Sequence, residues 1–269
     1  MTAASGTDSA QAAFDVLAPL YDRLTANHDH AAWAAQLEAL ARQAGLGGRR
    51  LLDVGCGTGA SAAPMLARGY DVVGVDISEG MLAAARERLG PDVRLERADM
   101  RALPVLGSFD LVWSVSDGVN FILGESELAD AFAGFARNLA PGGVVVFDVD
   151  TLASFRLLYT SLLVAQDEGA VVVFEGRAEG ELAAGSLAEA VVDRLEPADP
   201  PFWRRERAWH RQRHHPRERL EAALAAAGLR CVAVWGTDGA GGSEQPLDEL
   251  RHGKAVYIAQ HAAPDEGRR

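Results

Sequence analysis

Short apolar runs alternate with amphipathic segments between residues 51 and 150. The runs are rich in valine and leucine, which favours buried strands, and the segments between them carry apolar residues at helical spacing. The pattern predicts strands at 51–54, 71–76, 93–96, 109–114 and 144–149, with helices at 61–68, 79–89 and 125–139. Strands separated by helices form right-handed βαβ units, so we expect a parallel sheet.

The pattern changes on both sides of this core. Residues 14–44 carry two helical stripes of apolar side chains, which predict a helical cap. After residue 150, Gly- and Pro-rich turns separate three strand-like segments at 170–174, 188–195 and 202–214, and these predict an antiparallel insertion. A helix at 218–227 and strands at 230–235 and 254–260 follow, with a flexible loop at 236–242. We therefore divide the chain into an N-terminal helical cap (1–45), a core (46–150), a β insertion or lid (151–215), a C-terminal helix and strands (216–262) and a disordered tail (263–269).

The first predicted strand ends in three glycines at alternate positions. Asp53 lies two residues before Gly55, and Gly57 and Gly59 follow. Because glycine adopts positive φ angles and allows close approach of a ligand, this segment predicts a strand, a tight turn and a helix around a nucleotide-like cofactor. Nicotinamide, flavin and S-adenosylmethionine (SAM) sites all use such a turn, so the glycines alone leave the cofactor open.

Acidic residues after the next two strands narrow the choice of cofactor. Asp76 ends the second strand, where a carboxylate accepts hydrogen bonds from both ribose hydroxyls. Asp99 suits an adenine amino group, and Met100 suits the face of the ring. Dinucleotide-binding turns place their last glycine one residue further on. These features favour SAM, in a site that contains Asp53, Gly55, Cys56, Gly57, Asp76, Ile77, Met81, Asp99, Met100 and Ser114.

Together with Pro141-Gly142-Gly143 before the fifth strand, these residues resemble the class I SAM-dependent methyltransferases. The resemblance covers about residues 51–150. It implies an α/β fold with a Rossmann-like, seven-stranded, mostly parallel sheet whose last strand is antiparallel. The helical cap and the antiparallel β insertion after the fifth strand complete the expected architecture.

A narrower resemblance involves bacterial small-molecule methyltransferases, among them enzymes that dimethylate the amines of nucleotide-linked sugars in antibiotic pathways. It rests on Tyr21-Asp22, His30, Trp33, the glycine turn, Asp99-Met100-Arg101 and residues 116–121 (SDGVNF). It implies methyl transfer to an amine or hydroxyl of a small molecule. The family can carry a histidine or tyrosine base after the fourth strand, but this chain has Phe121 there, so a histidine base is not expected at this position.

Methyl transfer from a sulfonium is an in-line displacement, so the protein mainly aligns donor and acceptor and excludes water. An amine acceptor must be neutral, whereas a hydroxyl usually needs a base. Tyr21 resembles a tyrosine near the sulfonium in sugar N-methyltransferases, and a core tyrosine is the alternative. Asp117 is the nearest ionisable candidate after the fourth strand, or else a turn-capping carboxylate. His30, the third catalytic candidate, lies on the cap, where a histidine is often merely solvated.

Two charged clusters bear on further ligands. Residues 202–219 contain seven arginines, which either bind an anionic acceptor such as a carboxylate or diphosphate, or balance an acidic surface. A second cluster offers oxygen atoms that suit Mg²⁺, but its spacing differs from that of catechol methyltransferases, so no metal is expected. Its members are Asp117, Asn120, Asp148 and Asp150.

Composition excludes several classes of partner. The net charge of -12 argues against a nucleic-acid substrate, because phosphate contacts need clustered Lys and Arg, and no Asn/Asp-Pro-Pro-Tyr segment of a base methyltransferase follows the fourth strand. Two cysteines, no leader-like start and no long apolar segment predict a cytoplasmic protein without a membrane partner. We consider a homodimer as the assembly and a SAM-binding regulator or silent subunit as the alternative to an enzyme.

Overall fold

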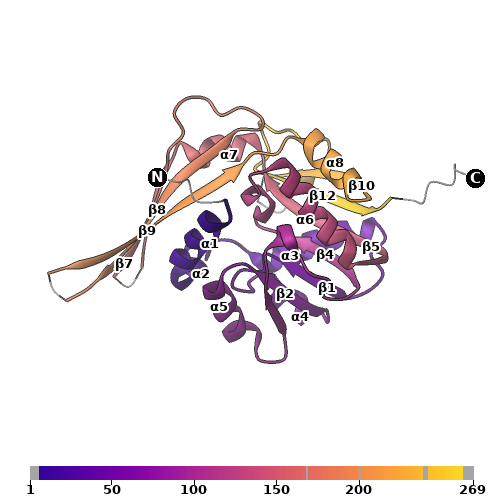
Figure 1. Cartoon of the computed structure of the whole chain (residues 1–269), viewed down its shortest axis with the longest axis horizontal. Helices are drawn as coiled ribbons and strands as arrows, with labels where there is room; N and C mark the ends of the chain where they lie inside the picture. The colour runs from indigo at the N-terminus through magenta and orange to yellow at the C-terminus, as the bar shows by residue number, and fades with distance from the viewer. Residues whose placement is uncertain (1–5, 168, 200, 239–241, 263–269) are drawn as a thin grey trace, which may run out of the picture.

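The computed structural model describes residues 6–167, 169–199, 201–238 and 242–262. Its larger sheet has eight strands in the order β11-β10-β12-β5-β4-β1-β2-β3 (Figure 1). The five core strands are parallel, as predicted: β1 (Arg50–Val54), β2 (Asp71–Asp76), β3 (Arg94–Arg97), β4 (Phe109–Ser114) and β5 (Leu139–Asp150). The prediction for β2 and β4 matches residue for residue, whereas β5 begins five residues earlier than expected.

The C-terminal strands complete the sheet. β12 (Lys254–His261) pairs antiparallel with β5, which confirms the expected antiparallel last strand. β10 (Leu229–Thr237) lies on the other side of β12, and the two-residue β11 (Ser243–Glu244) adds an edge strand beyond the seven expected. Residues 239–241 of the expected flexible loop and the expected tail at 263–269 lie outside the described residues.

Helices cover both faces of this sheet because successive strand residues point to opposite sides. Leu52 packs into the core that α6 (Glu125–Asn138) and α8 (Arg217–Ala226) share with the sheet. Leu51 packs into the opposite core, with α3 (His30–Gln43) and α4 (Ala62–Ala67). α5 (Glu79–Leu89) contacts β2 and β3. No helix of the described chain combines the length and apolarity that a bilayer crossing requires.

The N-terminal segment contributes to two parts of the molecule. α1 (Gly6–Leu17), the 3-10 turn η1 (Ala18–Leu20) and α2 (Tyr21–Leu24) contact α5 and the antiparallel sheet. α3, by contrast, buries Trp33 and Leu37 in the core of the large sheet. Within the predicted cap, α1 and α2 therefore lie against α5 and the antiparallel sheet, whereas α3 packs against the large sheet.

A separate antiparallel sheet has the order β6-β7-β8-β9, which confirms the predicted insertion (Figure 1). Its strands are β6 (Leu162–Asp167), β7 (Ala170–Gly176), β8 (Leu187–Pro197) and β9 (Trp203–Arg213). β6 and the preceding α7 (Leu152–Tyr159) were not predicted. The apolar start of β6 is an exposed sheet edge, with Leu162 64% and Val164 61% exposed, so no in–out alternation marked it as a strand.

Candidate functional site

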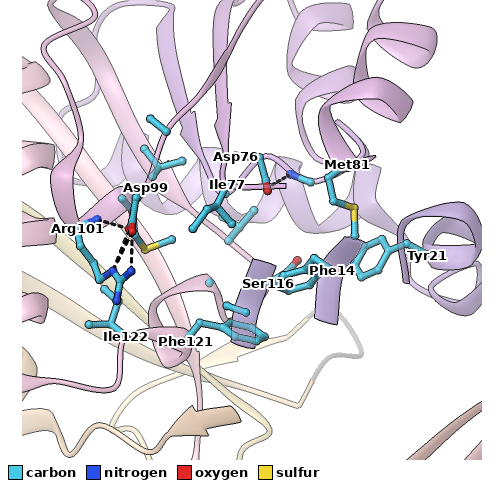
Figure 2. A pocket seen from close by; sticks show the side chains of 18 residues that line it. Phe14, Tyr21, Asp76, Ile77, Met81, Asp99, Arg101, Ser116, Phe121 and Ile122 are labelled. Atoms are coloured by element: carbon cyan, nitrogen blue, oxygen red, sulfur yellow. Dashed lines mark hydrogen bonds and ion pairs between the residues drawn. The ribbon is translucent and has the colours of Figure 1, made fainter. Parts of the chain in front are cut away.

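The glycine turn forms the floor of a cleft at the carboxyl ends of β1, β2 and β4 (Figure 2). Gly55 and Gly57 have φ angles of 79° and 54°, which glycine adopts without strain. The Gly55 and Cys56 amides donate to the Val75 carbonyl at 2.7 and 2.9 Å, which ties the turn to the end of β2. A Cβ on Gly57 would meet nothing within 4 Å, so the backbone here is open to a ligand.

Asp76 closes one side of this cleft. Its Oδ2 accepts a hydrogen bond from the Gly57 amide at 2.8 Å, and its Oδ1 accepts one from the Ser78 amide at 2.9 Å. The side chain is buried, and burial raises the pKa of its carboxyl despite these backbone donors. Ile77 and Met81 line the cleft beside it. Asp76 thus lies beside the glycine turn, where the sequence predicts that its carboxylate binds the ribose hydroxyls.

Asp99 and Met100 line the opposite end of the cleft, at the start of the 3-10 turn η2 (Met100–Ala102). The Arg101 guanidinium donates two hydrogen bonds to the Asp99 carboxylate, from Nε to Oδ1 at 3.0 Å and from Nη2 to Oδ2 at 2.6 Å (Figure 2). Partial burial opposes ionisation, but the hydrogen bonds from Arg101 lower the pKa of Asp99 below its ordinary value. Sequence reasoning did not assign Arg101 to the site, although it adjoins the predicted Asp99-Met100 pair.

Three aromatic rings form the wall over the floor of the cleft. The Phe14 ring lies 4.9 Å from the Phe121 ring and 6.2 Å from the Tyr21 ring, centroid to centroid. Phe14 comes from α1, Tyr21 from α2 and Phe121 from the 3-10 turn η3 (Gly118–Phe121), so the N-terminal cap covers the cleft (Figure 2). Burial, with the nearby Asp117 carboxylate, raises the pKa of Tyr21, so its hydroxyl stays protonated.

The structure brings most of the predicted site residues together. The cleft is lined by Tyr21, Gly55, Gly57, Asp76, Ile77, Met81, Asp99 and Met100. Four others lie behind or beside it. Cys56 is buried under the turn, where a Cβ on Gly74 would lie 3.0 Å from its Sγ. The buried Ser114 Oγ has no partner among the described residues and would lie 3.9 Å from a Cβ on Gly55. Asp53 and Asp117 are the remaining two.

Asp53 is fully buried, and neither carboxylate oxygen has a hydrogen-bond partner in the described part of the chain. Burial raises the pKa of Asp53 to about 7. A buried, unpaired carboxylate is costly, so its position under the glycine turn favours a cationic group or an ordered water there. The amino group of a bound amino-acid moiety fits this requirement.

His30 is the one catalytic candidate that the structure does not bring to the cleft. It is the first residue of α3, and its ring packs edge-on against that of His28, 4.7 Å between centroids. Partial burial, with the neighbouring His28, lowers the pKa of His30. Its surroundings are those of the N-terminus of α3 within the cap.

Asp117 belongs to a partly buried ionic cluster beside the aromatic wall. Its Oδ1 accepts a hydrogen bond from Lys254 Nζ at 2.6 Å, and the same ammonium lies 3.0 Å from Asp150 Oδ1 and 3.4 Å from Asp148 Oδ1. Asp148 also accepts the Ser116 and Asp117 amides at 2.8 and 2.7 Å, which stabilises two consecutive positive φ angles of 63° and 58°. The cluster therefore holds the turn after β4 in the shape that lines the cleft.

Lys254 was not identified from the sequence, although it is the only lysine in the chain. The β12–β5 register places it opposite Asp150, a pairing that the sequence pattern did not predict. Its ammonium contacts the carboxylates of Asp117 and Asp150, two of the oxygen donors considered for Mg²⁺. In the described part of the chain, no group of His, Cys, Asp and Glu residues is arranged to hold a metal.

Most arginines of the 202–219 segment have partners of their own. Arg205 and Arg207 both bind the Asp193 carboxylate on β8, and Arg211 binds Glu189 at 2.6 Å. Arg213 donates to the carbonyls of Leu123 and Gly185. Arg205, Arg207 and Arg211 thus pair with carboxylates, as the charge-balancing alternative expects, whereas Arg213 binds neutral carbonyls.

The fold and this site define a class I methyltransferase domain with SAM as its cofactor. Residues 51–143 match the family described as "Methyltransferase domain". An N,N-dimethyltransferase for dTDP-3-amino-3,4,6-trideoxy-alpha-D-glucopyranose from Streptomyces venezuelae is 39% identical over 120 residues, which are 45% of this chain and 50% of that protein. The matched region spans 46% to 65% of the length of the curated relatives it resembles.

Solved structures cover more of the chain. The crystal structure of Streptomyces venezuelae DesVI is 28% identical with a TM-score of 0.70, and the match covers 91% of this chain and 98% of that one. The sugar N-methyltransferase KedS8 from Streptoalloteichus sp ATCC 53650 is 29% identical with a TM-score of 0.70, over 89% of this chain and 91% of that one. The likeness therefore extends beyond the core to the cap and the β insertion.

Proposed function

We propose that this protein transfers a methyl group from SAM to the amine of a small molecule, and that a nucleotide-linked amino sugar is its acceptor. The observation that carries the proposal is the aromatic wall of Phe14, Tyr21 and Phe121 beside the cleft that the glycine turn, Asp76 and Asp99 line. It shields a site next to the glycine turn from water, as an in-line displacement requires. The amino-sugar dimethyltransferases among the relatives support the acceptor class.

Different residues of the cleft would bind different parts of the cofactor. The Asp76 carboxylate would bind the ribose hydroxyls, and Asp99 with Met100 would bind the adenine ring. The unpaired Asp53 carboxylate would attract the amino group of the methionine part, directly or through water. When bound, SAM supplies a methyl group already activated on its sulfonium. The chain's own contribution is to orient the acceptor nitrogen and to keep water out.

The ionisable lining of the cleft favours an amine over a hydroxyl acceptor. Among the described residues it consists of Tyr21, Asp76, Asp99 and Arg101. Asp99 and Arg101 bind each other, and Tyr21 stays protonated because burial raises its pKa. None of these groups is placed as a free base for a hydroxyl, whereas a neutral amine attacks without one.

The test is a turnover assay with SAM and dTDP-3-amino-3,4,6-trideoxy-α-D-glucopyranose as acceptor. We expect release of S-adenosylhomocysteine together with a product that gains one or two methyl groups by mass. The matched control is the same sugar nucleotide with a hydroxyl in place of the amine, which we expect to stay unmodified. SAM binding without S-adenosylhomocysteine release on a panel of amines would contradict the proposal and support the silent SAM-binding alternative.

A further inference from the structure

A chain of hydrogen bonds leads from the ionic cluster to a histidine beside the aromatic wall. Gln212 Nε2 donates to Asp117 Oδ2 at 2.7 Å, and Gln212 Oε1 accepts from the Tyr159 hydroxyl at 2.9 Å. The same hydroxyl lies 3.1 Å from Nδ1 of His210. His210 and Gln212 project to one face of β9, two residues apart. Tyr159 and Gln212 are fully buried, so the middle of this hydrogen-bond chain is screened from solvent.

The donor and the acceptor of each hydrogen bond in this series follow from the Asp117 carboxylate at one end. The Asp117 carboxylate only accepts and is ion-paired to Lys254, so the Gln212 amide must turn its NH₂ group toward it. The amide oxygen then faces Tyr159, and the hydroxyl gives it its only proton. The Tyr159 oxygen is left as an acceptor toward His210. Nδ1 of His210 must therefore carry a proton.

The other ring nitrogen of His210 is then an unprotonated acceptor. Nε2 has no hydrogen-bond partner among the described residues, and it is not one of their fully enclosed polar atoms. His210 as a residue keeps 8% of its surface exposed. Its ring packs edge-on against Phe121, 4.8 Å between centroids, and Phe121 lines the SAM cleft. Burial lowers the pKa of His210 to about 4, which keeps the ring neutral near neutral pH and makes it too weak a base to deprotonate a hydroxyl acceptor.

We propose that His210 Nε2 accepts a hydrogen bond from the methyl-accepting amine, and that Asp117, Gln212 and Tyr159 are positioning residues that set its tautomer. This inference rests on the proposed function. A neutral amine has two N–H donors and one lone pair, so holding an N–H on Nε2 turns the lone pair toward the methyl group. The nitrogen attacks the methyl carbon, the C–S bond breaks with its electron pair on sulfur, and the methylated ammonium later releases its proton to solvent. His210 thus supplies a polar contact on the side where Phe121 offers none.

The tautomer is measured directly on the ¹⁵N-labelled full chain by two-bond ¹⁵N–¹H correlation spectra of the histidine rings. His210→Asn assigns the resonance. We expect Nδ1 to carry the proton in the wild type. In Gln212→Leu the Tyr159 hydroxyl loses its amide acceptor and donates to Nδ1 instead, so we expect Nε2 to become protonated. Phe174→Leu is the matched control, since Phe174 packs on the same ring at 5.2 Å without joining the chain of hydrogen bonds.

Turnover links the tautomer to the reaction. With dTDP-3-amino-3,4,6-trideoxy-α-D-glucopyranose and S-adenosylhomocysteine we expect the Nε2 resonance to shift, and in Gln212→Leu we expect kcat/KM to fall by about tenfold or more while the Kd for SAM stays unchanged. A protonated Nε2 in the wild type, an unshifted resonance in a protein that methylates the sugar, or full turnover in Gln212→Leu would each overturn the inference. No turnover in the wild type with SAM binding intact would instead contradict the proposed function.

Discussion

Replacing Asp76 by asparagine tests the cofactor assignment most directly. The Asp76 carboxylate accepts two backbone amides, from Gly57 and Ser78, at 2.8 and 2.9 Å, and retains lone pairs for the ribose hydroxyls. The substitution keeps the shape of the side chain but removes its charge and turns one acceptor oxygen into a donor group. Charge-assisted hydrogen bonds contribute about 1.5 to 3 kcal/mol, so we expect the Kd for SAM to rise roughly 10- to 150-fold.

Isothermal titration calorimetry with SAM measures this change. Asp71→Asn is the matched control, because Asp71 begins the same strand, is exposed and lies 3.9 Å from Arg50 in a weak ion pair. Burial raises the pKa of Asp76, so removing its charge relieves part of the cost of burial, and we expect the free variant to stay folded by thermal denaturation. A folded Asp76→Asn variant that binds SAM within about twofold of the wild type would refute the assignment of the ribose site.

Three further predictions concern the wall, the ionic cluster and the floor. Tyr21→Phe should lower kcat/KM by about tenfold, measured by steady-state kinetics, with an unchanged Kd for SAM, measured by calorimetry. An equal loss of kcat/KM and of affinity for SAM would indicate a packing role. Lys254→Met should lower the unfolding free energy by about 3–5 kcal/mol in urea at pH 8, and by less at pH 5, where Asp150 (pKa about 6) takes up a proton; a pH-independent loss would contradict the charge argument. Burial raises the pKa of Asp53 to about 7, above its unfolded value, so the protein is most stable with respect to this group below about pH 4 and loses that stability as the pH rises through 7. Asp53→Asn should therefore increase the unfolding free energy of the free protein at pH 8 by on the order of 4 kcal/mol and raise its Tm. An unchanged Tm at pH 8 would count against this argument.

The strand pattern was predictable because parallel buried strands are apolar on both faces. β2 and β4 match the prediction residue for residue, since each is flanked by turns and buried in both cores. β6 was missed because a sheet edge buries neither face of its apolar start. β5 was predicted too short, because Pro141-Gly142-Gly143 is typical of a turn, whereas in the structure it lies within the strand.

The cofactor half of the site was predictable for a local reason. Gly55, Gly57 and Asp76 meet requirements of backbone conformation and strand ends, which a few consecutive residues specify. Arg101 was not assigned to the site, because only Asp99 and Met100 of this loop were expected to contact the adenine. The catalytic candidates remain predictions: the structure places Tyr21 in the cleft, Asp117 beside it in an ion pair, and His30 away from it.

The sequence by itself determined the sheet, the glycine turn and the choice of SAM, because these depend on residues close together in the chain. Only the tertiary structure decided what faces the acceptor. Lys254 reaches Asp117 across 137 positions, and Gln212 reaches the same carboxylate across 95. Contacts of such long range arise from strand register and from the packing of the β insertion on the core. No local pattern records them.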